Sequence, residues 1–161
     1  MEVEMKVKSL MMDPVTQMPI VILRDPSGDS VLPIWVGLFE ANAIALQLEK
    51  VATPRPMTHD LLRSVISTME AKVERIVITD LKENTFFAIV HLNHNGHALR
   101  VDSRPSDAIA LALRTESPIY VSKEVIDKAR RTDLRDEPGE SERLRKWLEK
   151  LDPQDLGKYE M

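Results

Sequence analysis

The chain of 161 residues contains no cysteine, which excludes disulfides, thiolate metal sites and cysteine nucleophiles and fits a reducing cytoplasm. Aromatic residues make up only 4% of it, so aliphatic side chains must build the core. No hydrophobic run approaches the roughly 20 residues of a membrane-spanning helix, and the alternating N-terminus does not resemble a signal peptide. We therefore expect a cytoplasmic protein with no membrane partner.

The chain also lacks a basic run. It carries 22 Lys and Arg against 26 Asp and Glu, for a net charge of -4, and acids and bases nearly balance as far as Arg131. Tight binding to nucleic acid without regard to sequence relies on several Lys and Arg contacts to phosphates. This charge distribution therefore predicts that any binding to nucleic acid is weak or transient.

What the sequence does contain is an internal repeat. The segment Ala43-Ile44-Ala45-Leu46 recurs 65 residues later as Ala108-Ile109-Ala110-Leu111. An alternating strand pattern precedes each copy, and a glycine-containing turn precedes each strand. Two copies indicate a duplicated half-domain, since a solenoid needs about three or more units. The two halves cover about 15–51 and 80–116.

Hydrophobic periodicity predicts the secondary structure. Strands are expected over 3–11, 18–23, 31–36, 73–81, 85–92, 97–101 and 119–121, and helices over 38–51, 58–69, 105–114 and 123–131. The second helix carries an apolar stripe that we expect to be buried, formed by Leu61, Leu62, Val65, Ile66 and Met69. Runs of strands followed by a helix predict an α+β fold, with a largely antiparallel or mixed sheet and packed helices.

The domain predicted from these elements covers 1–131. Residues 132–138 are polar and indicate a charged linker. Beyond it, Leu144, Trp147, Leu148 and Leu151 have the spacing of one face of an amphipathic helix. We therefore expect the segment 132–161 to hold a linker and a C-terminal helix that docks on the body or on a partner chain.

Three histidines, His91, His94 and His97, have spacings that suggest a metal site. If Asn95-Gly96 forms a two-residue turn, His94 and His97 are neighbours across a hairpin. Side chains alternate between the faces of a strand, so His91 points to the opposite face. Zinc usually takes three or four converging ligands, and a solvated hairpin tip is the interpretation that the spacing favours.

Polar residues gather where the second strand-to-helix junction is predicted, in the segment Val101–Asp107. Its carboxylates, Asp102 and Asp107, could hold a divalent metal ion through oxygen ligands, and Arg104 could hold a phosphate. Ser103 could instead cap the helix, with Asp107 in its first turn stabilising the helix dipole. Both interpretations remain open.

The equivalent junction in the first half carries Gly37 and Glu40. Glycine there allows a close backbone approach or a positive φ, and Glu40 supplies an acid. A third helix start follows Arg55 and contains His59, which could act as a general base. Capping or solvation also explains these residues, since helix starts select such types.

Three segments at these junctions resemble the bifunctional nuclease domain family: Leu32–Gly37 with Glu40-Ala41, Arg55–Leu61 and Val101–Ala112. The resemblance spans about 1–131. It implies a compact α+β fold with a duplicated motif, self-association as a homodimer or higher oligomer, and nuclease activity on RNA and DNA.

These observations predict a nuclease that hydrolyses phosphodiester bonds, assisted by Mg²⁺ or Mn²⁺. In this hypothesis Asp102 and Asp107 hold the metal ion, and Glu40 and His59 handle protons. Substrate would be bound by Arg104, Ser103, Ser106 and Arg55. The alternative is a non-catalytic, self-associating regulatory module that binds a small anion or a protein.

Overall fold

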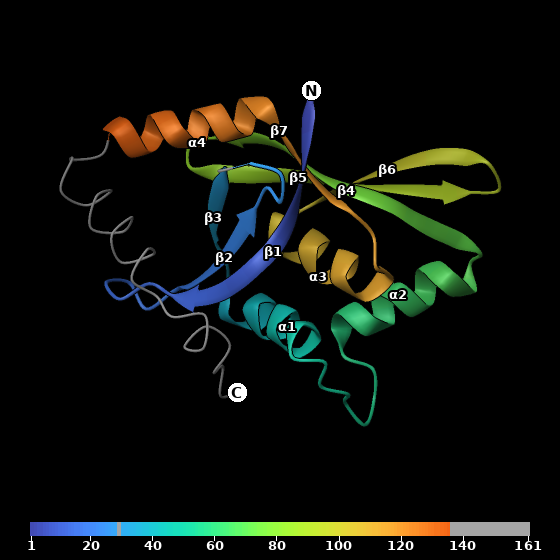
Figure 1. The fold of residues 1–161 in the computed structure, drawn as a ribbon. Coiled ribbons are helices and arrows are strands. Elements are labelled where there is room, and N and C mark those ends of the chain that lie inside the picture. The colour runs from blue at the N-terminus through green and yellow to red at the C-terminus, as the bar shows by residue number, and fades with distance from the viewer. Residues whose placement is uncertain (29, 136–161) are drawn as a thin grey trace.

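The computed structural model describes residues 1–28 and 30–135. In this part of the chain a seven-stranded sheet has the order β3-β2-β1-β7-β4-β5-β6 (Figure 1). The strands are β1 (Glu2–Met12), β2 (Pro19–Arg24), β3 (Val31–Trp35), β4 (Ala71–Lys82), β5 (Thr85–His94), β6 (His97–Ser103) and β7 (Ile119–Ser122). The helices are α1 (Leu38–Leu48), α2 (Thr58–Thr68), α3 (Pro105–Thr115) and α4 (Lys123–Arg135). The prediction of an α+β fold with a mixed sheet is confirmed.

The short strand β7 divides the sheet into two three-stranded antiparallel meanders. It pairs antiparallel with β1 on one side and parallel with β4 on the other. Each meander, β1-β2-β3 or β4-β5-β6, leads directly into a helix, α1 or α3. This arrangement accommodates the two copies of the sequence repeat, and a common origin for the two halves stays a prediction.

Helices cover both faces of the sheet. The helices α1, α2 and α3 lie on one face, and α4 packs on β4 and β7 from the other (Figure 1). The central helix is α3, which contacts β4, β5, α1 and α2. Its run of small and aliphatic residues, Ala108–Ala112, is fully buried. Helices approach one another closely where side chains are small, so the alanines of the repeat let α1 and α3 pack together.

The helix α2 differs from the prediction. It contains no buried residue, and Leu61 and Met69 are 57% and 63% exposed. The expectation of a buried stripe is therefore wrong. Periodicity shows that a helix has an apolar face, but not whether another layer covers that face. Here four residues of the stripe, Leu61, Leu62, Val65 and Ile66, line an open cleft.

The β5–β6 hairpin has the predicted register. His94 pairs with His97, and His91 lies opposite Arg100. The positive φ values of Asn95 (53°) and Gly96 (81°) are those of a two-residue hairpin turn. The histidines therefore do not converge.

The end of the domain also differs from the prediction. Residues 132–135 continue α4 to Arg135, so they are helical where the sequence suggested a linker. Residues 132–135 include no proline or glycine, the residues that most often stop a helix, which explains the error. The C-terminal helix predicted around Trp147 lies outside the described residues. Within residues 1–28 and 30–135, no helix has the length and apolar character needed to cross a membrane.

Candidate functional site

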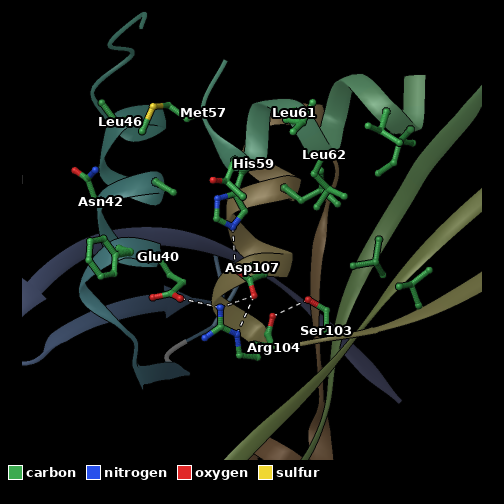
Figure 2. Close-up of a pocket in the computed structure, with 18 of the residues that line it drawn as sticks. Glu40, Asn42, Leu46, Met57, His59, Leu61, Leu62, Ser103, Arg104 and Asp107 are labelled. Carbon is green, nitrogen blue, oxygen red and sulfur yellow. Dashed lines mark hydrogen bonds and ion pairs between the residues drawn. The ribbon is translucent and has the colours of Figure 1, made fainter. Parts of the chain in front are cut away.

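An open cleft of about 1040 Å³ lies between α1, α2 and the end of β6. Much of its lining is aliphatic, with Leu46 from α1 and Leu61 and Leu62 from α2 (Figure 2). Polar side chains gather at one end, where α3 begins. Apolar walls with a few convergent polar groups are typical of a ligand-binding site.

Four polar residues from three helix starts form a continuous chain of contacts in the cleft (Figure 2). The carboxylate of Asp107 accepts hydrogen bonds from His59 Nε2 to Oδ1, at 2.8 Å, and from Arg104 Nε to Oδ2, at 2.9 Å. Arg104 Nη2 also donates to Glu40 Oε1, at 2.7 Å. We call His59, Asp107, Arg104 and Glu40 the polar chain.

The fold positions the polar chain by bringing together helix starts that are distant in sequence. Arg104 is the N-cap residue of α3, and Asp107 stands three positions later. Glu40 lies in the first turn of α1, and His59 is the second residue of α2. Acidic side chains are favoured near helix N-termini by the helix dipole, so the first turns are stable places for both carboxylates.

The caps themselves differ from the sequence expectation. The N-cap residue of α3 is Arg104 and not Ser103, the N-cap residue of α2 is Met57, and neither provides a side-chain cap. At α2 the Asp60 carboxylate accepts a hydrogen bond from the Met57 N–H, at 2.9 Å. At α3 the Ser103 hydroxyl donates to the Arg104 carbonyl, at 2.8 Å. The capping interpretation of Ser103 is therefore wrong.

Arg104 is a permanent cation at the centre of the polar chain. Hydrogen bonds to Glu40 and then to Asp107 raise the pKa of its guanidinium group. Its side chain is 65% exposed, and its Nη1 group has no partner among the described residues. A guanidinium fixed on one edge and open on the other can hold an anionic oxygen.

The imidazole of His59 is held by the carboxylate of Asp107. With Asp107 accepting from Nε2–H, the lone pair is on Nδ1. A carboxylate that fixes the tautomer of an imidazole and stabilises its protonated form is a recurring arrangement in hydrolytic sites. The largely buried ring is thus held in one orientation.

A further ion pair, which the sequence analysis did not predict, holds α2 against α3. Arg114 is buried, its side chain 2% exposed, and its Nε donates to Asp60 Oδ1 at 2.7 Å. Its other donors reach the carbonyls of Ala110, at 2.9 Å, and Ala43, at 3.0 Å. Arg114 therefore connects all three helices of this face. The available signal was a single cation at the end of the apolar run of α3.

Asp60 is held in its charged form. Hydrogen bonds from the Met57 N–H and from Arg114 lower the pKa of its carboxyl group below 3.8, against a smaller opposing effect of burial. Because Asp60 is next to His59 in sequence, the ion pair with Arg114 also fixes where His59 lies.

The remaining candidates are dispersed. Asp102 is exposed at the edge of the cleft, and its carboxylate forms no hydrogen bond or ion pair with other described residues. Ser103 lines the cleft, whereas Ser106 is buried within α3 and Arg55 is exposed in the loop before α2; neither of these two lines the cleft.

The metal pair predicted at Asp102 and Asp107 stays a prediction. Both oxygens of Asp107 are engaged, one by His59 and one by Arg104. Among residues 1–28 and 30–135, no three His, Asp or Glu side chains are grouped so that they could hold a metal ion. A divalent ion at Asp107 would compete with Arg104 and His59 for the carboxylate oxygens.

The fold and the site together define a class: an α+β domain whose cleft joins apolar walls to a histidine–carboxylate–arginine chain. The model of the bifunctional nuclease domain matches residues 21–133. The chain belongs to this family.

Relatives of the chain fall into two groups. An uncharacterized protein of Mycobacterium tuberculosis (strain ATCC 25618 / H37Rv) is 36% identical over 164 residues, covering 95% of this chain and 97% of the relative. Bifunctional nuclease 1 of Arabidopsis thaliana is 28% identical over 109 residues, and bifunctional nuclease 1 of Oryza sativa subsp. japonica is 26% identical over 109. These matches cover 65% and 66% of this chain but only 34% and 33% of the plant proteins.

Proposed function

We propose that this protein is a nuclease that hydrolyses phosphodiester bonds at the polar end of the cleft. The observation that carries the proposal is the polar chain, in which a carboxylate orients a histidine beside a guanidinium that keeps one edge open. Membership of the bifunctional nuclease domain family and the names of the plant relatives support the same activity on RNA, DNA or both.

Each member of the polar chain has a distinct role in this proposal. Arg104 Nη1 binds a non-bridging oxygen of the scissile phosphate. His59 Nδ1 removes a proton from a water molecule, whose oxygen attacks phosphorus while the bond to the leaving oxygen breaks. The leaving oxygen takes up a proton from solvent, and His59 later releases its proton to solvent. Asp107 orients His59 and stabilises its protonated form, and Glu40 holds Arg104 in place.

No step in this mechanism is assigned to a metal ion, because no three His, Asp or Glu side chains among the described residues are grouped to hold one. Dependence on Mg²⁺ or Mn²⁺ stays a prediction. Asp102 is the residue that can test it, since its carboxylate is unengaged and lies at the cleft edge. Loss of metal-stimulated cleavage in Asp102→Asn, with the EDTA-resistant rate unchanged, would support a metal role for Asp102.

The test uses purified full-length protein and fluorescent RNA and DNA oligonucleotides, in Mg²⁺, in Mn²⁺ and in EDTA. His59→Gln and Asp107→Asn should each lower kcat by about 10²- to 10⁴-fold, the usual contribution of general acid–base catalysis. His97→Gln is the matched control, because His97 is exposed on the β5–β6 hairpin outside the cleft. Equal cleavage by wild type and the His59 and Asp107 variants would contradict the proposal.

The alternative is the non-catalytic module that binds a small anion. Its support is the open edge of the Arg104 guanidinium, which could hold one anionic group. Arg104 is the one arginine or lysine among the described lining residues, which suits a small anion better than a chain of phosphates. A phosphate-dependent rise in melting temperature that is lost in Arg104→Gln, without cleavage of any oligonucleotide, would favour it. The self-association implied by the family resemblance also stays a prediction, to be measured by light scattering.

A further inference from the structure

We propose that Phe39 is a stacking platform for a nucleobase next to the scissile phosphate, and that the substrate is therefore single-stranded. This inference rests on the proposed nuclease function and deepens it by naming the substrate class. It starts from an aromatic side chain that the fold leaves uncovered.

Phe39 is 85% exposed, in the first turn of α1, and it lines the cleft. The chain has only three phenylalanines. Phe86 packs against the core, and Phe87 lies under the ammonium group of Lys82. Burying a phenylalanine side chain is favourable relative to leaving it exposed to water. Folding does not use this contribution at Phe39, which leaves it available to a ligand.

The position of Phe39 is set by its neighbour. It directly precedes Glu40, whose carboxylate holds Arg104. Consecutive Cα atoms are about 3.8 Å apart, so Phe39 projects from the helix start that also carries the carboxylate holding Arg104, and both residues line the same cleft. A base flanking that phosphate is the part of the substrate that meets Phe39.

The cleft carries few positive charges, so affinity for a nucleic acid must come largely from contacts with the bases. Arg104 is the one arginine or lysine among the described lining residues, and it already faces two carboxylates. Attraction to phosphates therefore contributes little affinity. The opposite wall offers the apolar side chains of Leu61, Leu62 and Val101. Apolar and aromatic surface binds the flat faces of bases without regard to sequence.

Stacking of this kind selects single strands. In a duplex the base faces are covered by their neighbours, and exposing one requires unstacking and unpairing. A cleft that binds mainly through base faces therefore favours RNA or DNA whose bases are already free. This distinction concerns strand form and not the sugar.

The experiment compares three variants at residue 39 with one control. Phe39→Ala removes the side chain, Phe39→Leu keeps apolar volume without the ring, and Phe39→Trp keeps an aromatic ring. Leu38→Ala is the matched control, because Leu38 is the preceding residue, is 59% exposed and does not line the cleft. Each protein is assayed on single-stranded oligonucleotides and on the matched duplex, and binding is measured separately by fluorescence anisotropy.

We expect Phe39→Ala to raise KM and Kd for single strands by about 5- to 100-fold, the range of base–aromatic stacking, with kcat little changed. Phe39→Leu should resemble the alanine variant, and Phe39→Trp should resemble wild type. An oligonucleotide with an abasic residue at the stacked position should bind wild type as weakly as Phe39→Ala, which should itself be insensitive to the missing base.

Several outcomes would overturn the inference. One is an abasic penalty of the same size in wild type and Phe39→Ala. Another is a changed oligomeric state in Phe39→Ala with unaltered KM, which would assign Phe39 to an interface between copies. If wild type binds single strands through Phe39 but cleaves none, the proposed nuclease function fails while the stacking site stands. If wild type cleaves single strands and substitutions at residue 39 change neither KM nor Kd, the stacking site fails while the proposed nuclease function stands.

Discussion

The carboxylate of Glu40 occupies the space that a Cβ atom on Gly37 would fill. The backbone of Gly37 is extended, with φ -70° and ψ 157°, a conformation that other residues adopt without strain. Glycine is therefore required here for close approach and not for its conformational freedom. It lets the Glu40 side chain fold back over the start of α1 and reach Arg104.

Gly37→Ala should displace Glu40 without unfolding the domain. The added methyl group meets the end of a flexible side chain, which can move away. We expect a stability change within about 1 kcal/mol, together with a loss of activity like that of Glu40→Gln. Thermal denaturation and cleavage kinetics on both variants provide the test. A fully active Gly37→Ala protein would contradict the role given to Glu40.

Arg114→Ala should be strongly destabilising. It leaves Asp60 without its partner and removes donors from the Ala43 and Ala110 carbonyls. Breaking a buried ion pair by removing one partner costs about 3–5 kcal/mol, and partial exposure of Asp60 favours the lower end. Arg63→Ala is the control, because Arg63 lies on the surface of α2 and makes one hydrogen bond of 3.2 Å to the Arg114 carbonyl. Urea denaturation should show a change at Arg63 of about 1 kcal/mol or less.

The contribution of Asp60 to stability should disappear in acid. Its pKa in the folded protein lies below 3.8, chiefly because the Met57 N–H and Arg114 stabilise the carboxylate. A carboxyl group whose pKa is lowered by folding contributes stability above its unfolded pKa and loses it as the pH falls through the folded value. The difference in melting temperature between wild type and Asp60→Asn should therefore be constant from pH 7 to about 5 and narrow below 3.8. A gap that widens in acid would contradict this assignment.

Binding of single strands should depend only weakly on salt. Each phosphate contact contributes a slope of about 0.7 to the logarithmic dependence of affinity on salt for single strands, and the described cleft offers Arg104 alone. We expect the affinity to fall with a slope of about 0.7 for wild type and about zero for Arg104→Gln, measured by anisotropy at salt concentrations from about 50 to about 300 mM, on either side of physiological ionic strength. A steep slope would indicate a basic surface elsewhere or a contaminating protein.

Much of the fold was predictable because each element satisfies local rules. The Asn95-Gly96 turn fixes the register of the β5–β6 hairpin, and the apolar run of α3 predicts a central helix. Strand patterns do not show which strands become neighbours. The insertion of β7 between β1 and β4 joins segments that are distant in sequence, and no local pattern contains that information.

The site was predictable in its parts but not in its connections. Helix starts select polar residues, so Glu40, His59, Arg104 and Asp107 were recognisable as candidates. The contacts of Asp107 with His59 and of Arg104 with Glu40 cross 48 and 64 residues, which only the tertiary fold determines. For the same reason Asp107 could be assigned to a metal ion, although its two oxygens already have partners.

The helix that carries His59 has no fully buried residue and is held to α3 by the Asp60–Arg114 and His59–Asp107 contacts. Among its side chains only Ile66 packs against the core, so local detachment of α2 has its own free energy, smaller than the global free energy of unfolding. Hydrogen exchange should therefore report α2 amides exchanging well before those of α3. Local opening of α2 would then break the contacts of the polar chain while the sheet stays folded. In that case activity is lost at a lower temperature than the one at which the whole domain unfolds.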